Sequence, residues 1–390
     1  MVTLIKGGKV YAPQYIGNKD ILICGDKIEL IEDSINVDSC GLCVKVIEAS
    51  GKLVFPGFID SHVHILGGGG EGGFKTRTPE IKLSDLTTAG VTTVVGCLGT
   101  DGISRNMRSL LAKARALEEE GISTFIYTGS YRIPVKTIME NVQEDIILID
   151  KIIGVGEVAL SDHRSSHPTF EQFVQLVSDA RIGGILSGKA GIVNVHMGDG
   201  KSELDYMDRL AKETDIPLTQ IIPTHMNRNP SLFQKGLEYA KKGGYVDFTT
   251  STTEKFLEEG ETKCSTGLKI MLDNGVDIKN ITFTSDGQGS LPDFDENGNY
   301  IGLKVGKCES LYKEVSDAII NENISIENAI TVITSNPAER LKLKTKGKLK
   351  VGFDADIVLV NENDFNINTV IAKGRIMIHE NKILVLGTFE

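Results

Sequence analysis

Residues 53–71 read LVFPGFIDSHVHILGGGGE and carry the strongest local signal in this chain of 390 residues. An apolar run leads into His62-Val63-His64, and a glycine run follows at 67–70. Side chains alternate between the two faces of a β-strand, so His62 and His64 point to one side and can bind one metal ion together. The glycines let the backbone approach a bound molecule closely. Taken alone, H-x-H also fits the exposed face of an edge strand, so the other histidines must distinguish the two interpretations.

Length and composition predict one large domain with a smaller one, and 40% hydrophobic residues are enough for a large core. No run of apolar residues is long enough to span a membrane, and the N-terminus lacks the pattern of a signal peptide. The net charge is −11, without a basic cluster. We therefore expect neither nucleic acid nor a membrane as partner.

Cysteine usage points to a reducing compartment. Cys40-x-x-Cys43 is a single pair with no second pair downstream and no nearby histidine, whereas a structural zinc site needs four ligands. We expect free thiols and a cytoplasmic protein. The six cysteines are Cys24, Cys40, Cys43, Cys97, Cys264 and Cys308.

Apolar β-type runs alternate with helix-like segments between about residues 57 and 340. Eight such units predict an α/β fold, a (β/α)8 TIM-type barrel with a parallel sheet buried on both faces. The runs begin at Phe58, Val91, Thr124, Ile152, Ile192, Thr219, Tyr245 and Ile281.

Both ends of the chain are strand-like and show no helical period. Ile21-Leu22-Ile23-Cys24 followed by Gly25-Asp26 is a hairpin signal. Such short terminal segments would struggle to form separate domains. We predict one small β-sandwich domain from residues 1–55 plus 345–390, beside a catalytic barrel at 56–344.

Histidines and acidic residues gather at the predicted strand ends, where a TIM-type barrel places its chemistry. Four of the seven histidines fall there, together with two carboxylates. Imidazole and carboxylate suit zinc, and six ligands exceed the needs of one tetrahedral ion. Two divalent ions about 3.5–4 Å apart, most simply Zn²⁺, fit the count. The predicted ligands are His62, His64, Glu157, His196, His225 and Asp286.

At these residues the chain resembles the amidohydrolase superfamily, and within it the isoaspartyl (β-aspartyl) dipeptidases. The resemblance spans essentially the whole chain and implies a metal-dependent hydrolase acting on small β-aspartyl dipeptides. It rests on Pro56-Gly57-Phe58-Ile59-Asp60, Gly67–Glu71, Leu98–Asp101, Tyr127–Tyr131, Ser161–Ser165, His196–Asp199, Pro223–Asn229 and Ser285–Ser290.

One position departs from the family pattern. Members usually bridge their metals with a carboxylated lysine on the fourth strand, but the equivalent residue here is Glu157, and Lys151 lies at the start of the strand. Glutamate keeps the charge, but its carboxyl carbon lies about 3–4 Å nearer the backbone. We expect Glu157 to bridge both ions, with Gly154 and Gly156 letting the backbone come closer. One tight and one weak metal site is the alternative.

The resemblance also implies roles in catalysis. A bridging hydroxide would attack the peptide bond, with Asp286 as general acid and base. Tyr131 would donate its hydroxyl to the oxyanion. Arg164 and Arg228 would pair with substrate carboxylates. The ammonium group would be held by Glu71 and Ser290, with a further contact from Thr100.

Other functions stay open at this stage. The nearest is another amidohydrolase, such as a cyclic-amide hydrolase or an N-acyl amino acid deacetylase. A non-catalytic scaffold of the same fold is more remote, since all four histidines and Asp286 are present. The resemblance further implies a homo-oligomer, an octamer in the family.

Overall fold

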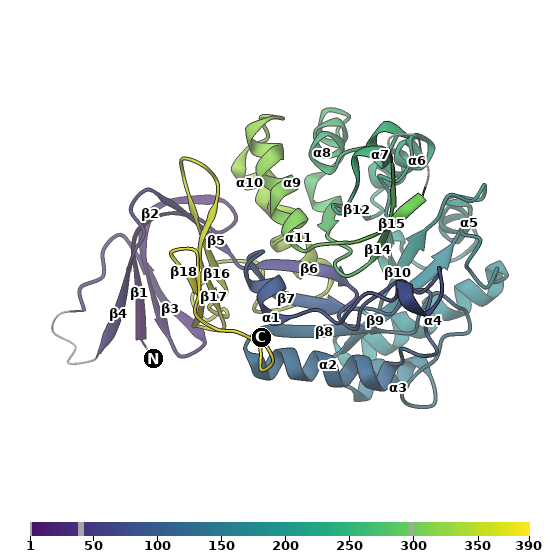
Figure 1. The fold of residues 1–390 in the computed structure, drawn as a ribbon, viewed down its shortest axis with the longest axis horizontal. Helices are drawn as coiled ribbons and strands as arrows, with labels where there is room; N and C mark the ends of the chain where they lie inside the picture. The colour runs from purple at the N-terminus through teal and green to yellow at the C-terminus, as the bar shows by residue number, and fades with distance from the viewer. Residues whose placement is uncertain (1, 38–42, 296–299) are drawn as a thin grey trace.

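The computed structural model describes residues 2–37, 43–295 and 300–390. Figure 1 shows a sheet built from both chain ends, purple and yellow, beside a larger body of strands and helices. Cys40 of the Cys40-x-x-Cys43 pair lies outside the described residues. Among those described, no helix is long and apolar enough to cross a membrane.

The terminal sheet joins the two ends of the chain. From the N-terminal part, β5 (Lys52–Pro56) pairs antiparallel with β16 (Ile357–Asn361) from the C-terminal part. The predicted hairpin at Gly25-Asp26 is confirmed, because Cys24 pairs with Lys27. A separate apolar core under the sheet draws on both ends, from Ile5 to Ile376. Its strands are β1 (Val2–Tyr11), β2 (Tyr15–Cys24), β3 (Lys27–Glu32), β4 (Val44–Glu48), β5 (Lys52–Pro56), β16 (Ile357–Asn361), β17 (Ile367–Ala372), β18 (Arg375–His379) and β19 (Lys382–Ile383).

The larger body contains a curled parallel sheet of six strands and a parallel pair of two more. Each predicted apolar run overlaps one strand; Thr219 and Gln220 instead lie in a 3₁₀ turn, Leu218–Gln220. The six are β6 (Phe58–Val63), β7 (Val91–Gly96), β8 (Ser123–Thr128), β9 (Ile152–Leu160), β10 (Ile192–Met197) and β11 (Ile221–Thr224); the pair is β12 (Val246–Thr249) and β13 (Ile281–Thr284).

Helices follow the strands and cover the sheet. β6, β7, β9 and β10 are buried along their whole length, as expected for parallel strands covered on both faces. Local residues set where the helices begin and end. Before α2 (Met107–Glu120), the Asn106 side chain accepts hydrogen bonds from two backbone N–H groups, and Gly121, with a φ of 126°, ends the helix. The first six helices are α1 (Leu83–Thr87), α2 (Met107–Glu120), α3 (Val142–Leu148), α4 (Phe170–Ser187), α5 (Asp205–Glu213) and α6 (Pro230–Lys241).

Side chains connect the six-stranded sheet to the β12–β13 pair at both edges. Thr224 at the end of β11 donates its hydroxyl to Asp247 of β12 at 2.7 Å. At the other edge, the Ser285 backbone N–H donates to Asp60 of β6 at 3.2 Å. These bonds bring the carboxyl ends of the strands together around one centre.

A β-hairpin that the sequence did not predict follows β13. β14 (Ser290–Phe294) pairs antiparallel with β15 (Tyr300–Val305) and borders the same end of the body. The remaining helices are α7 (Glu254–Glu258), α8 (Cys264–Asp273), α9 (Glu309–Ile320), α10 (Ile326–Thr331) and α11 (Ser335–Arg340), with 3₁₀ turns also at Phe74–Thr76 and Ile278–Asn280.

Candidate active site

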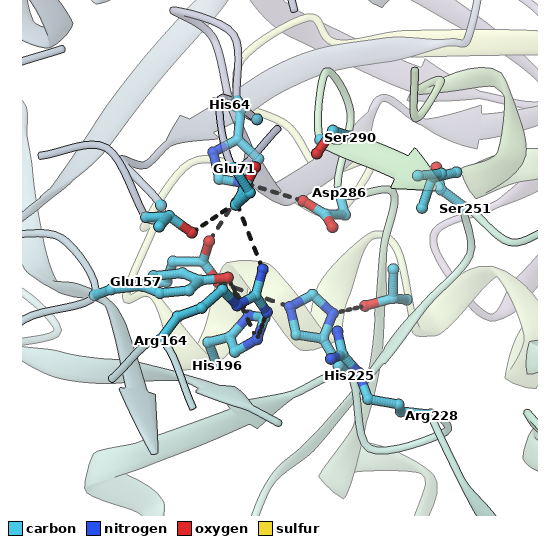
Figure 2. A pocket seen from close by; sticks show the side chains of 18 of the residues that line it. His64, Glu71, Glu157, Arg164, His196, His225, Arg228, Ser251, Asp286 and Ser290 are labelled. Atoms are coloured by element: carbon cyan, nitrogen blue, oxygen red, sulfur yellow. Dashed lines mark hydrogen bonds and ion pairs between the residues drawn. The ribbon is translucent and has the colours of Figure 1, made fainter. Parts of the chain in front are cut away.

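A cavity of about 480 Å³ opens at the carboxyl ends of the parallel strands. Five of the six predicted metal ligands line it, and Figure 2 shows their side chains converging on one space. The sixth, His62, lies fully buried beneath them. The structure therefore brings the six predicted residues together.

Strand ends explain why they meet. His62 and His64 flank Val63, the last residue of β6. Glu157 lies in β9 and His196 in β10, while His225 and Asp286 come just after β11 and β13. These last two residues adopt left-handed backbone conformations, with φ of 62° and 52°. Such conformations are unfavourable for residues other than glycine and cluster at functional sites.

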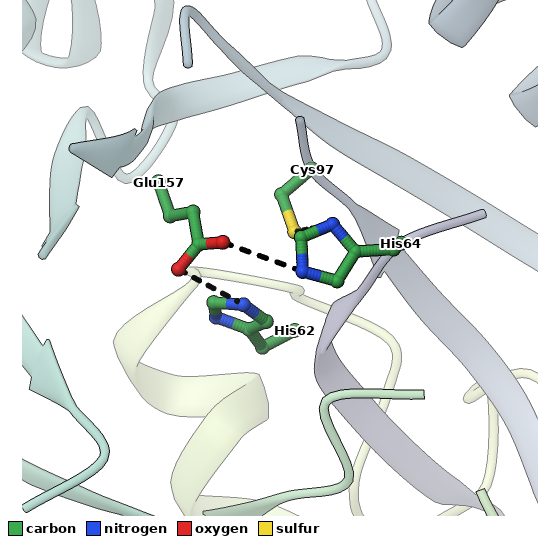
Figure 3. A group of neighbouring side chains, drawn as sticks. All are labelled: His62, His64, Cys97 and Glu157. Atoms are coloured by element: carbon green, nitrogen blue, oxygen red, sulfur yellow. Dashed lines mark hydrogen bonds and ion pairs between the residues drawn. The ribbon is translucent and has the colours of Figure 1, made fainter. Parts of the chain in front are cut away.

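Glu157 occupies the middle of the group. Its Oε1 lies 3.3 Å from His64 Nε2, and its Oε2 lies 3.3 Å from His62 Nε2 (Figure 3). The same Oε2 is 3.1 Å from His196 Nδ1 and 3.7 Å from His225 Nε2. Asp286 Oδ1 faces His64 Nε2 at 3.1 Å. Each carboxylate oxygen of Glu157 thus faces a different set of imidazoles.

The donor atoms fit divalent metal. Ligands about 2.0 Å from a tetrahedral zinc ion are roughly 3.3 Å from one another, close to the separations around Glu157. Two groups of potential ligands share Glu157, one with His62 and His64 and the other with His196 and His225. Among the described residues, both nitrogens of His62 and Oδ1 of Asp286 are buried without a hydrogen-bond partner. Buried polar atoms rarely remain unsatisfied, so these atoms are suited to binding a cation.

The electrostatics of the group favour positive charge at its centre. Burial raises the pKa of Glu157, but His62, His196 and His225 outweigh burial and hold it well below its ordinary value. Burial likewise opposes ionisation of Asp286, yet chiefly His64 lowers its pKa to about 2. Both carboxylates are therefore ionised at neutral pH, in the state that binds metal.

A β-bulge carries Glu157 toward the other ligands. Val155 pairs with Val193 and Val158 with Val195, so two residues of β9, Gly156 and Glu157, stand opposite one residue of β10. A bulge bends the strand and redirects its side chains. A Cβ on Gly156 would lie 2.9 Å from the Asn194 Cβ, so only glycine fits there. Backbone displacement can thus offset the shorter side chain of glutamate.

Cys97 was missed as a neighbour of the metal group. It follows β7, is fully buried, and its Sγ lies 3.9 Å from His64 Nδ1. Figure 3 shows it beside the His64 ring, and its sulfur belongs to the donor group of His62, His64 and Glu157. It is therefore a further potential ligand. The sequence offered no signal for it beyond its position at a strand end.

Four of the predicted substrate residues form one contact path. The Tyr131 hydroxyl lies 2.9 Å from His196 Nδ1. Arg164 Nη1 lies 3.5 Å from Glu71 Oε1, and Thr100 donates its hydroxyl to the same oxygen at 2.8 Å. Figure 2 shows Arg164 between Glu71 and His196. These residues come from distant parts of the sequence, so only the fold brings them together.

Arg228 and Ser290 line the same cavity. Arg228 lies 3.8 Å from the exposed Asp199. The glycine loop is packed rather than open, since a Cβ on Gly69 would lie 3.0 Å from the Ser290 Cβ. This packing brings Ser290 to the loop that carries Glu71.

Two acidic residues near the cavity were also missed. Asp162, two residues after β9, lies 3.0 Å from His196 Nε2 and 2.7 Å from Arg164 Nη2. Glu261 lines the cavity, and burial raises its pKa to about 7. Asp162 lies within Ser161–Ser165, one of the strings on which the family resemblance rests, but only its contacts distinguish it from a surface aspartate.

Comparison with known proteins agrees with this geometry. Residues 53–377 match the Amidohydrolase family. The chain is 45% identical to a crystal structure of β-aspartyl dipeptidase from Fervidobacterium islandicum AW-1 in complex with β-Asp-Leu, covering 100% of this chain and 99% of that one at a TM-score of 0.92.

More distant proteins are also similar to this chain. A deacetylase from Brucella anthropi is 24% identical over 91% of this chain and 82% of its own length. Dihydropyrimidinase from Brevibacillus agri, at 17% identity, covers 99% of this chain and 97% of its own with a TM-score of 0.68.

Proposed function

The chain belongs to the amidohydrolase family, and from this premise we propose that it is a metal-dependent hydrolase that cleaves β-aspartyl dipeptides. One observation carries the proposal: the 45% identity over the full chain with a β-aspartyl dipeptidase bound to β-Asp-Leu. The buried group of histidines and carboxylates supplies the donors that such a hydrolase needs.

We propose two divalent-metal sites that share Glu157, most simply both for Zn²⁺. His62 and His64 would hold one ion, and His196 and His225 the other. Asp286 would complete the first site. The separations of about 3.3 Å around Glu157 and the unpartnered buried atoms support this assignment. Cys97 offers a further donor at the first site.

Glu157 would replace the carboxylated lysine of other family members, so the bridge would need no carbon dioxide. The bulge at Gly156-Glu157 supports this proposal, because it displaces the backbone where a longer side chain would otherwise be required. Oε1 lies near His64, whereas Oε2 lies near His62, His196 and His225, so the one carboxylate reaches both groups of histidines, which supports a bridging role.

Catalysis would divide among three groups. When bound, zinc would act as a Lewis acid and would lower the pKa of a bound water toward neutrality. Asp286, ionised and within 3.1 Å of His64, would accept the proton of that water and pass it to the leaving amine. Tyr131, with a neutral buried hydroxyl, would donate to the developing oxyanion.

Charged residues on the cavity wall fit a small zwitterionic substrate. Arg164 and Arg228 would pair with its carboxylates, since guanidinium groups form bidentate bonds with them. Glu71 and Ser290 would hold its ammonium group, and Thr100 already binds Glu71. A site that binds both chain ends would exclude longer peptides.

Arg228→Ala tests this account. We expect kcat/KM for β-Asp-Leu to fall about 10- to 100-fold, because a charge-assisted bond to substrate contributes about 1.5–3 kcal/mol and the carboxylate loses its partner. Steady-state kinetics measure the change. Arg115→Ala, which removes an arginine exposed on α2, is the control and should behave like wild type. Unchanged kinetics for Arg228→Ala would remove it from the site.

A substrate panel tests the reaction itself. We expect the protein to hydrolyse β-Asp-Leu much faster than α-Asp-Leu, dihydroorotate, hydantoin or an N-acetyl amino acid. The last three compounds represent the cyclic-amide hydrolases and deacetylases of the same family. A preference for any of them over β-Asp-Leu would contradict the proposal. Metal analysis of the purified protein excludes a non-catalytic scaffold if it finds zinc.

Three broader assignments accompany the function. We propose that β6–β13 close into a (β/α)8 barrel, supported by the bonds of Asp247 and Asp60 across the two edges. We propose domain boundaries at 1–55 plus 345–390 and 56–344, with the terminal sheet curling into a sandwich around its own core. By family resemblance we also propose a cytoplasmic homo-oligomer, an octamer.

A further inference from the structure

Asp162 is a buried carboxylate, and each of its two oxygens contacts two nitrogen atoms. Its Oδ2 lies 3.0 Å from His196 Nε2 and 2.7 Å from Arg164 Nη2. Its Oδ1 accepts from the Arg164 Nε at 3.0 Å and from the Arg164 backbone N–H at 2.7 Å. The side chain is only 3% exposed. Although burial raises the pKa of this carboxyl, His196 and Arg164 hold it well below its ordinary value.

His196 uses its two nitrogens in different directions. Nδ1 faces Glu157 Oε2 at 3.1 Å, on the side of the predicted metal site, and Nε2 faces Asp162. A neutral imidazole carries one proton, so donating Nε2–H to a carboxylate leaves the Nδ1 lone pair for a metal. Such a partner also fixes the orientation of the ring and makes the other nitrogen more basic.

Arg164 continues the path toward the substrate side of the cavity. Its Nη1 lies 3.5 Å from Glu71, which accepts the hydroxyl of Thr100. Asp162 thus stands between the predicted metal ligand His196 and the predicted carboxylate-binding Arg164. Among the residues that the structure describes, no other carboxylate is recorded in contact with both.

We propose that Asp162 is a positioning residue that holds His196 for metal binding and Arg164 for substrate binding at the same time. One buried carboxylate then supports both metal binding and substrate binding. The Arg164 half of this inference rests on the proposed function. The His196 half requires only that the chain binds metal.

The variant Asp162→Asn keeps the size of the side chain but removes its charge. We expect zinc affinity at the site that contains His196 to fall about 10–100-fold, the usual effect of losing the partner of a metal-bound histidine. We also expect KM for β-Asp-Leu to rise. Zinc affinity is measured on metal-free protein by competition with a chromogenic chelator, and Tm reports folding.

Two further variants separate positioning from a general effect on the fold. Arg164→Met should raise KM while zinc affinity stays within threefold of wild type, because Asp162 still holds His196. Asp150→Asn breaks an exposed pair with Arg115, 2.9 Å long and remote from the cavity, and should change neither quantity. Wild-type zinc affinity in a folded Asp162→Asn protein overturns the proposal, as does an equal loss of zinc affinity in Arg164→Met.

A crystal structure of the zinc-loaded wild type decides the matter if Asp162→Asn does not fold. His196 must bind zinc through Nδ1 while Nε2 stays within hydrogen-bond distance of Asp162, and binding through Nε2 overturns the proposal. Failure of the proposed function is recognised separately. If the wild type binds zinc but does not hydrolyse β-Asp-Leu, the function is wrong while the zinc measurements still test Asp162.

Discussion

Replacing Asp286 by Asn should lower kcat for β-Asp-Leu by about 10²–10⁴-fold, the range that a general acid or base contributes. Asparagine has nearly the same shape and keeps one carbonyl oxygen near His64, but it cannot accept the proton of the attacking water. The chemical step should suffer while substrate binding changes little, so KM should stay within a few-fold of wild type. Steady-state kinetics give both constants.

The metal content of Asp286→Asn must be measured beside its kinetics, because Asp286 Oδ1 also faces His64 and His62 at 3.1 and 3.7 Å. We expect zinc to remain bound by the histidines and Glu157. Asp273→Asn, in an exposed pair with Lys269 on α8, is the matched control and should retain wild-type activity. A kcat within threefold of wild type in a zinc-replete Asp286→Asn protein would exclude the acid–base role.

Glu157→Gln should reduce kcat/KM about 10³-fold or more. It removes a carboxylate that faces all four histidines, and with it the charge that both proposed metal sites would share. The loss of metal-based stabilisation costs several kcal/mol, and each ~1.4 kcal/mol is tenfold in rate. We expect bound zinc to fall below that of the wild type, by elemental analysis of dialysed protein.

The same residue predicts independence from carbon dioxide. Since the carboxylate of Glu157 is encoded in the sequence, bicarbonate should not change wild-type activity or its recovery after zinc is added to metal-free protein. Glu213→Gln, on the exposed side of α5, is the control for the substitution and should bind zinc normally. Full zinc binding and activity in Glu157→Gln would show that Glu157 is not the bridge.

Much of the site could be predicted because its residues obey a local rule. His62, His64, His196 and His225 each lie at or just beyond the end of an apolar run, and parallel strands bring those ends together. Strand and helix positions likewise follow from short-range patterns of apolar residues and caps, as at Asn106 and Gly121. Such patterns need no knowledge of distant contacts.

Other features depend on contacts that no local pattern reports. In the sequence, Cys97 cannot be distinguished from the other free thiols; the fold places it at the end of β7, next to His64. Asp162 likewise cannot be distinguished from a surface aspartate until its contacts with His196 and Arg164 are known. The β14–β15 hairpin beside the cavity was also missed. Each case depends on residues far apart in sequence.

Glu157 separates what the sequence pattern determines from what only the tertiary structure determines. Sequence alone was enough to identify alternating strands and helices and the histidines at strand ends, because these depend on residue identity and periodicity. It was also enough to identify a glutamate at the position where the family that the chain resembles usually has a carboxylated lysine. Whether a side chain about 3–4 Å shorter can reach both groups of histidines depended on tertiary structure. The answer lies in the bulge at Gly156-Glu157 and its packing on Asn194, since register between two strands is set by their pairing across space.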